Sequence, residues 1–312
     1  MAEMIKISGL VKRYGRKLAV DNISMSVSEG EIVGFLGPNG AGKSTTMNIL
    51  TGYLSSTAGE VKVGGIDILE NPAEAKKLIG FLPEQPPLYT EMKVIEYLRF
   101  VYELKGCKLN RDKHLDEVMK VTRIIDVADR VIGNLSKGYR QRIGIAQAIV
   151  GNPKIIVLDE PTIGLDPKQI IEIRNLIRNL GRSHTVILST HILQEVQAVC
   201  DRIIIINAGR IVADEKTENI ARTVEENRRY SLTVAGPQSE VLRVLREVEG
   251  VAACDCDGGR IDDAYTYIIT SERGVDVRKP VFYALAKASY PIMALEPVSM
   301  GLEEVFVRLT EK

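Results

Sequence analysis

One stretch of the chain decides its fold: Gly37-Pro38-Asn39-Gly40-Ala41-Gly42-Lys43-Ser44. It matches the pattern G-x-x-x-x-G-K-[ST] and follows the apolar segment Glu31–Leu36, which predicts a buried strand, while Lys43–Thr51 predicts a helix. Glycines in such a loop let backbone N–H groups surround phosphate groups at a helix N-terminus. We therefore expect Lys43 to bind the β and γ phosphates of ATP, with Ser44 binding Mg²⁺ and Thr45 next to it.

A second apolar strand ends in two acidic residues. Ile155–Leu158 is followed by Asp159 and Glu160. Alone, such a pair is more often a solvated turn, but the phosphate-binding loop upstream favours a role in chemistry. We expect Asp159 to hold Mg²⁺, usually through water, and Glu160 to polarise the attacking water as general base.

Composition limits the function classes. With 312 residues, 45% hydrophobic and 26% charged, the chain has the composition of a soluble globular protein with two domains. Lys plus Arg and Asp plus Glu both number 41, and this balance argues against nucleic acid as the partner. No apolar run approaches the ~20 residues of a membrane-spanning helix, and no secretory signal is present, so we expect a cytoplasmic protein.

The order of predicted elements indicates an α/β fold. Residues 4–27 predict antiparallel strands, and residues 91–134 predict an all-helical insert, part of a helical subdomain at about 91–150. Beyond it strands and helices alternate, which predicts a mostly parallel sheet covered by helices on both faces. We expect a nucleotide-binding domain over residues 1–220 and a linker over 221–229.

Residues 230–312 predict a small C-terminal α+β domain. Their order of elements, βαββαβ with a last helix at Leu302–Leu309, is that of the ferredoxin-like split βαβ arrangement. Cys254 and Cys256 are a possible soft-metal pair, but no further Cys or His lies near them in sequence. The simpler interpretation is two small side chains on one face of a strand.

The segment Leu135–Arg142, Leu-Ser-Lys-Gly-Tyr-Arg-Gln-Arg, indicates one protein family when its position in the chain is considered. By itself it predicts only a serine cap on an amphipathic helix. Placed shortly before Asp159 and Glu160, it resembles the LSGGQ signature of ABC ATPases, with Lys137 in place of a glycine and Tyr139 in place of the glutamine.

The resemblance implies the ABC type of P-loop NTPase fold, with a RecA-like core, an antiparallel β subdomain and a helical subdomain. It also implies that Ser136 and Gly138 contact the γ-phosphate bound by the opposite subunit, because the family's subunits dock head to tail. Tyr14 would stack on adenine, Asp166 belongs to the D-loop, and His191 is the switch histidine that touches the γ-phosphate.

One family element departs from the pattern. After Ile79–Pro83, Glu84 occupies the position where the family has a glutamine that senses Mg²⁺ and the attacking water, and Gln85 follows it. Either side-chain oxygen is able to bind the ion. The ungapped alignment favours Glu84.

Glu84, the signature with Lys137 and Tyr139, and the segment Gly301–Phe306 are similar to features of one subgroup of the family. This subgroup is the ATPases of ABC-2 type exporters, including multidrug and gliding-motility-associated subunits. The resemblance implies a separate membrane permease, a second copy of this chain, and a position at the inner face of the cell membrane. The alternative is a soluble ABC ATPase that acts on nucleic acid or ribosomes, but the long coiled coil or second ATPase domain of those proteins is not found here. The cargo is not readable from the sequence.

Overall fold

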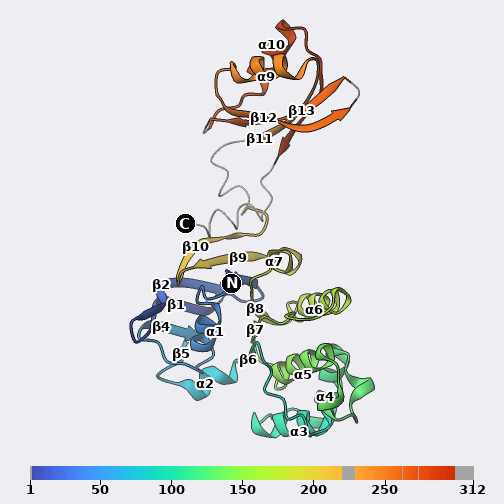
Figure 1. Cartoon of the computed structure of the whole chain (residues 1–312). Helices are drawn as coiled ribbons and strands as arrows, with labels where there is room; N and C mark the ends of the chain where they lie inside the picture. Colours follow the sequence, from blue (N-terminus) through green and yellow to red (C-terminus); the bar gives the residue numbers. More distant parts are fainter. Residues whose placement is uncertain (1, 220–228, 262, 273, 299–312) are drawn as a thin grey trace. The chain divides into compact units, whose positions relative to one another are not determined.

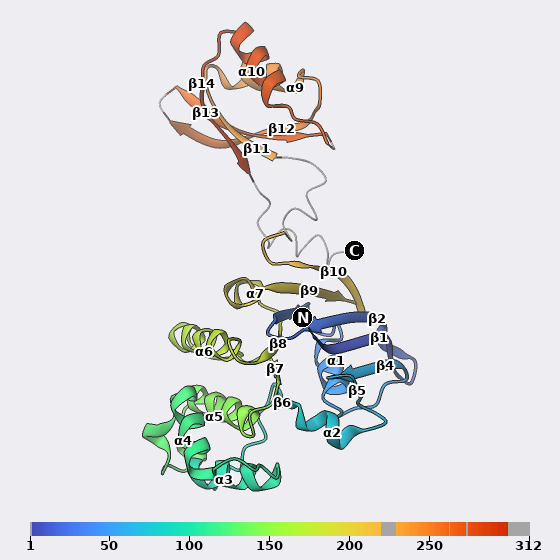
Figure 2. The same cartoon turned by 180° about the vertical axis from the view of Figure 1, so that it is seen from behind.

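The computed structural model describes residues 2–219, 229–261, 263–272 and 274–298. It divides at Thr217 into two compact units, an N-terminal unit and a C-terminal unit that begins at Glu218. Figures 1 and 2 show the elements from opposite sides.

The N-terminal unit begins with a four-stranded antiparallel sheet of order β2-β1-β4-β5. Its strands are β1 (Glu3–Tyr14), β2 (Lys17–Ser28), β4 (Ala58–Val63) and β5 (Ile66–Asp67). Apolar side chains such as Ile5, Ile7 and Val27 are buried on one face of this sheet. They form one core with Phe35 and Val157 of the second sheet, so the two sheets pack together.

The second sheet has six strands in the order β10-β9-β3-β8-β7-β6. They are β3 (Ile32–Leu36), β6 (Ile79–Leu82), β7 (Ile155–Asp159), β8 (Thr185–Thr190), β9 (Arg202–Asn207) and β10 (Arg210–Lys216). All pairs are parallel except the β9–β10 hairpin. Every residue of β3, β7 and β8 is buried, as expected for the centre of a parallel sheet covered on both faces.

Helices cover this sheet unevenly. Outside the insert, the described part of the N-terminal unit contains α1 (Lys43–Leu50), α2 (Pro72–Lys77), α6 (Pro167–Leu180) and α7 (Leu193–Val199). Helix α1 lies on the side that also carries the four-stranded sheet, and α6 lies on the opposite side (Figures 1 and 2). The expectation of helices on both faces therefore holds only in part, because a sheet shares one of the faces.

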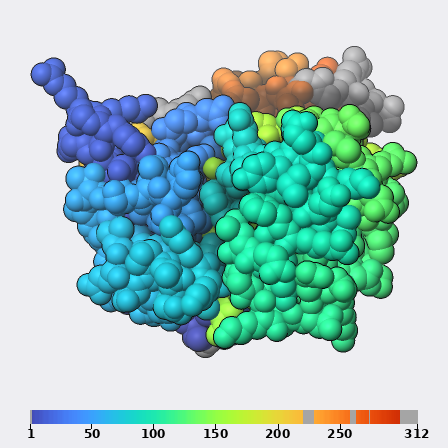
Figure 3. All heavy atoms as spheres, turned by 90° about the horizontal axis from the view of Figure 1, so that it is seen from below, coloured from blue at the N-terminus to red at the C-terminus, as the bar shows by residue number. Residues whose placement is uncertain are grey.

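The helical insert extends over residues 91–150, beyond the expected 91–134, because the next helix packs with the two helices of that range. It contains α3 (Val94–Leu104), α4 (Arg111–Thr122), the 3₁₀ turns η1 (Ile125–Val127) and η2 (Ile132–Asn134), and α5 (Lys137–Ile149). Tyr97, Leu98 and Val101 recur at helical spacing on α3 and are buried. In Figure 3 the insert, in teal to green, forms one half of a broad face, next to the blue and cyan residues that precede it.

The C-terminal unit is an antiparallel sheet of order β12-β13-β11-β14. Its elements are β11 (Arg229–Ala235), α9 (Gln238–Arg246), β12 (Val251–Ile261), β13 (Ala264–Ser271), α10 (Arg278–Lys287) and β14 (Ile292–Val298). Tyr230, Leu232 and Val234 of β11 form a core with Val241 of α9 and Val281 of α10. The helix expected at 302–309 and most of the expected linker lie outside the described residues.

The two cysteines of β12 belong to this core. Cys254 is 3% exposed and Cys256 packs against the same cluster. Among the residues that the structure describes, no three His, Cys, Asp or Glu side chains gather as metal ligands. The structure thus gives Cys254 a packing role.

The same described part of the chain contains no helix that is both long and apolar enough to span a membrane.

Candidate nucleotide-binding and catalytic site

The phosphate-binding loop joins the end of β3 to the start of α1. Its glycines are required by close approaches of the backbone: a Cβ on Gly37 would lie 2.3 Å from the carbonyl oxygen of Ile206, and one on Gly42 would lie 2.5 Å from that of Ala19. Gly42 also has a φ of 109°, which side-chain-bearing residues rarely adopt. The loop is therefore seated against β9 and β2, with its N–H groups at the α1 N-terminus.

A pocket of about 630 Å³ opens beside this loop. Predicted site residues that line it are Tyr14, Asn39, Gly40, Gly42, Lys43, Ser44, Thr45, Glu84, Glu160 and His191. The structure thus brings together residues from β1, α1 and the ends of β6, β7 and β8. Sequence reasoning missed Lys17, Ala19 and Ile163, which also line the pocket, because no motif marks them.

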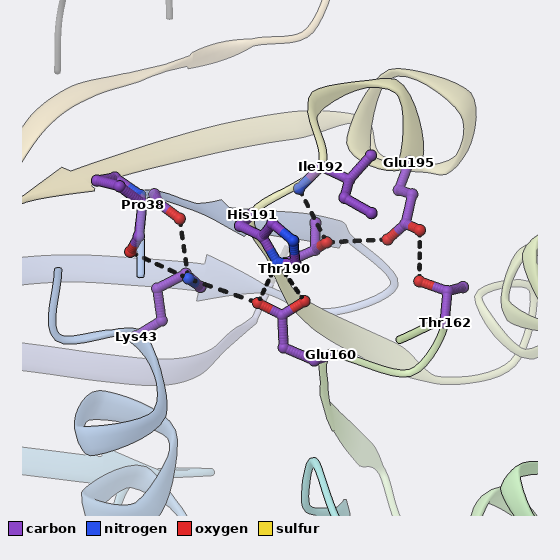
Figure 4. A network of polar contacts seen from close by, with 9 residues as sticks. Pro38, Lys43, Glu160, Thr162, Thr190, His191, Ile192 and Glu195 are labelled. Atoms are coloured by element: carbon purple, nitrogen blue, oxygen red, sulfur yellow. Dashed lines mark hydrogen bonds and ion pairs between the residues drawn. The ribbon is translucent and has the colours of Figure 1, made fainter. Parts of the chain in front are cut away.

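Lys43 is held at the floor of the pocket. Its side chain is 6% exposed, and its ammonium group donates to the carbonyl oxygens of Gly37, at 2.8 Å, and Pro38, at 3.2 Å. It also lies 3.5 Å from Oε1 of Glu160 (Figure 4). A buried cation next to the N–H groups of the loop is suited to balance phosphate charge.

Glu160 is held between Lys43 and His191. Its carboxylate oxygens lie 3.0 and 2.9 Å from Nδ1 of His191. The φ of Glu160 is 49°, in the left-handed region, which costs about 1–3 kcal/mol for a residue other than glycine. Its N–H donates to the carbonyl oxygen of Ser189 over 2.9 Å, which ties this strained residue to β8. Strain fixed in this way is typical of a residue positioned for chemistry.

Asp159 directly precedes Glu160 but is not among the residues that line the pocket. It is 3% exposed, and burial raises its pKa although the hydroxyls of Ser189 and Ser44 act in the opposite direction. Its Oδ1 atom is buried and has no hydrogen-bond partner among the described residues. An unpaired carboxylate oxygen beside Ser44 fits a Mg²⁺ ion bound through water, and such an ion would neutralise phosphate charge.

Tyr14 and Glu84 lie at the rim of the pocket. Tyr14 ends β1, is 45% exposed, and has the ammonium group of Lys12 at 5.1 Å from its ring centroid. Its ring thus remains accessible for stacking. Glu84 lines the pocket two residues after β6 ends, whereas its neighbour Gln85 is not part of that lining.

The signature segment opens α5. Ser136 is the N-cap of this helix, where its hydroxyl accepts from the N–H of Tyr139 over 3.4 Å. A Cβ on Gly138 would lie 2.7 Å from Cδ of Gln169, so the helix start packs closely on α6. Asp166 caps α6 by accepting from the N–H of Gln169 over 2.9 Å.

These signature and D-loop residues are not brought together with the phosphate-binding loop. Ser136, Gly138 and Asp166, all described by the structure, are not among the residues that line the Lys43 pocket. Within one copy of the chain, these three residues therefore lie outside the Lys43 pocket.

Comparisons with known proteins agree with this geometry. Residues 20–163 match the family model described as "ABC transporter". The bacitracin transport ATP-binding protein BcrA of Bacillus licheniformis is 30% identical over 89% of this chain and 93% of its own length. YhcH of Bacillus subtilis, an uncharacterized ABC transporter ATP-binding protein, is 36% identical over 99% of this chain and 97% of its own.

A solved structure agrees as well. The dimeric, post-hydrolysis state of the ATP-binding cassette MJ0796, bound to ADP and Pi, superposes with a TM-score of 0.62 at 30% identity, over 69% of this chain and 99% of that one. The predicted ABC-type P-loop NTPase fold is thereby confirmed for the nucleotide-binding unit. The chain belongs to the ABC transporter family, as an ATP-binding protein that hydrolyses ATP.

Proposed function

We propose that this chain powers export through a separate ABC-2 type permease, and that ATP closes two copies of it head to tail. The observation that carries the proposal is the separation of the site residues within one copy: Lys43 and Glu160 line the pocket, whereas Ser136 does not. A second copy turned head to tail would supply Ser136 and Gly138 to the γ-phosphate, and Asp166 to the interface.

The predicted site residues then have separate tasks. Lys43 binds the β and γ phosphates, and Ser44, Asp159 and Glu84 would hold Mg²⁺, which would neutralise phosphate charge. Glu160 accepts a proton from the attacking water, and His191 orients Glu160 and contacts the γ-phosphate. Tyr14 stacks on the adenine ring.

The helical insert is the part suited to meet a permease. Phe100 and Leu104 are exposed there, and so is Tyr89, which lies just before the insert. The rings of Tyr89 and Phe100 meet edge to face, with 5.4 Å between their centroids. Tyr89 follows Glu84 by five residues, so a partner bound at these side chains lies close in sequence to a pocket residue. The name of BcrA, a transport protein, favours transport over action on nucleic acid or ribosomes.

The experiment measures association by light scattering on a sizing column. Glu160→Gln keeps the size of the side chain but cannot accept the proton, so ATP should bind and persist. We expect this variant to be monomeric without nucleotide, dimeric with ATP and monomeric with ADP.

A second change serves as the control. Ser136→Arg, added to Glu160→Gln, should prevent dimerisation and leave ATP binding by the monomer intact. If Glu160→Gln shows no ATP-dependent association, and a constitutive dimer held by the C-terminal unit is excluded, the head-to-tail mechanism is wrong.

A further inference from the structure

A buried carboxylate lies behind the catalytic pair. Glu195, in the first turn of α7, is 1% exposed. Its Oε1 accepts a hydrogen bond from the hydroxyl of Thr162, and its Oε2 accepts one from the hydroxyl of Thr190 over 2.9 Å. Both threonines are buried as well. Figure 4 shows this chain of contacts beside Glu160 and His191.

The two threonines belong to the two segments that carry the pocket's reactive side chains. Thr190 is the last residue of β8 and directly precedes His191. Thr162 follows Glu160 by two residues, on the segment that leads to Asp166. Glu195 is therefore hydrogen-bonded to both segments at once, close to the contact between Glu160 and His191.

A further hydrogen bond joins the two residues that flank His191 in sequence. The hydroxyl oxygen of Thr190 accepts from the N–H of Ile192 over 3.1 Å while its proton goes to Glu195. The residues before and after His191 are thus bonded to each other, and this unit is anchored on Glu195. Burial of a carboxylate costs free energy unless its oxygens are hydrogen-bonded. Loss of either threonine hydroxyl would therefore leave a buried oxygen without its partner.

We propose that Glu195 is a positioning residue, which holds the Glu160 segment and the His191 segment in register so that the two side chains face the same phosphate. Glu195 lies behind the pair and is not part of the pocket lining. The inference rests on the roles proposed above for Glu160 and His191. It adds that the segment leading to Asp166 moves together with His191 because both are bonded to one carboxylate.

A carboxylate is needed here rather than an amide. The two hydroxyls donate to two different oxygen atoms, and only an ionised Asp or Glu has an acceptor oxygen at both positions. In Glu195→Gln an NH₂ group replaces one carboxylate oxygen. The threonine hydroxyl that donated to that oxygen then faces another donor and loses its acceptor. The Thr190 oxygen accepts from Ile192 with one lone pair, and if it accepted from the new NH₂ group with the other, its own proton would lose its acceptor.

The test measures kcat and KM for ATP hydrolysis by the full chain. We expect Glu195→Gln to lower kcat about ten-fold with KM changed less than about two-fold, within the range of coupling through positioning contacts. Thr162→Val and Thr190→Val should each lower kcat similarly, and the double variant should be no worse than either, because both break one unit. Thr162→Ser and Thr190→Ser keep the hydroxyl and should keep kcat.

Thr122→Val is the matched control. Thr122 is fully buried, and its hydroxyl donates to the carbonyl oxygen of Val118 over 2.8 Å, within α4 of the helical insert. Its change removes a buried hydroxyl of the same kind and should leave kcat unchanged. Multiplicative losses in the Thr162 and Thr190 double variant, or an equal loss in Thr122→Val, would overturn the proposal.

Failure of this inference is distinguishable from failure of the proposed site. Normal turnover by Glu160→Gln would show that the general base is misassigned. An inactive Glu160→Gln beside a Glu195→Gln that turns over ATP at the normal rate would overturn the role of Glu195 alone. If Glu195→Gln does not fold, the two threonine variants and their serine counterparts decide the matter by themselves.

Discussion

Tyr139 of α5 and Asp126 of η1 are joined by a hydrogen bond of 2.6 Å in which the phenol donates to the carboxylate. This bond is the main reason why the pKa of Tyr139 is raised. Tyr139 occupies the position where the LSGGQ signature has glutamine. In this chain the tyrosine hydroxyl at that position is hydrogen-bonded to Asp126. The bond fastens the first turn of α5 to the rest of the helical insert.

Removal of that hydroxyl should weaken the insert. We expect Tyr139→Phe to lower the free energy of unfolding of the full chain by about 1 kcal/mol, a modest value because the pair is open to solvent. Thermal or chemical unfolding measures it. Tyr53→Phe, at an exposed position, is the control, and equal stability of both variants would show that the bond contributes nothing.

Tyr14 should matter for its ring and not for its hydroxyl. Stacking on a base is worth about 1–3 kcal/mol per base, so Tyr14→Ala should weaken ATP binding roughly ten-fold or more. Tyr14→Phe should bind as the unchanged chain does. Titration with a fluorescent ATP analogue gives the dissociation constants, and three equal values would make Tyr14 a surface residue without a role in binding.

Asp159 should oppose folding in the absence of metal. Since burial raises its pKa, the folded state favours the protonated carboxyl, and the ionised form weakens the fold increasingly as pH rises above the ordinary carboxyl value of about 4. Asp159→Asn carries no charge. It should raise Tm by about 2–4 °C at pH 7.5, and the gain should shrink as the pH falls toward 4.

The same variant should lose Mg²⁺-dependent hydrolysis, so stability and activity move in opposite directions. The exposed Asp129 provides a control, because Asp129→Asn should leave both Tm and turnover unchanged. An Asp159→Asn protein that is less stable than the unchanged chain at pH 7.5, without Mg²⁺ and nucleotide, would show that the carboxylate supports the fold.

The C-terminal unit should be dispensable for nucleotide binding. All described residues that line the pocket beside Lys43 precede Thr217, where the two compact units divide. A fragment of residues 1–229 should therefore stay folded and bind ATP with the affinity of the full chain, as measured by calorimetry. An aggregated or non-binding fragment would show that the N-terminal unit depends on the residues removed.

The sequence predicts the centre of the N-terminal unit well and its edges poorly. The central strands are recognisable because they are almost entirely apolar, as at Ile32–Leu36 and Ile155–Leu158. The phosphate-binding loop follows the first of them, and the Asp159-Glu160 pair ends the second. Strand β10, Arg210–Lys216, alternates exposed and partly buried residues and contains several charged ones. At a sheet edge such a strand is half solvated, so its composition resembles that of a linker.

The candidate site shows the same limit. Motifs place the side chains that contact a nucleotide, because phosphate chemistry restricts residue type and spacing. Glu195 belongs to no recognisable motif. A glutamate in the first turn of a helix is ordinarily exposed to solvent, where its negative charge interacts favourably with the helix dipole. Only the fold brings Thr162 and Thr190 to its two oxygens, from segments 28 residues apart.

The seating of the phosphate-binding loop has a consequence for the interpretation of missense variants. At Gly37 and Gly42 any other residue meets main-chain oxygens of the same molecule before a nucleotide arrives. A loss-of-function allele there reports on the integrity of the loop and carries no information about contact with ATP. Gly40 has a φ of 81° but no atom within 4 Å of its missing Cβ, and asparagine tolerates that region. A Gly40→Asn allele therefore meets no main-chain clash, and a loss of binding there would come from backbone strain at this φ or from contact with the ligand.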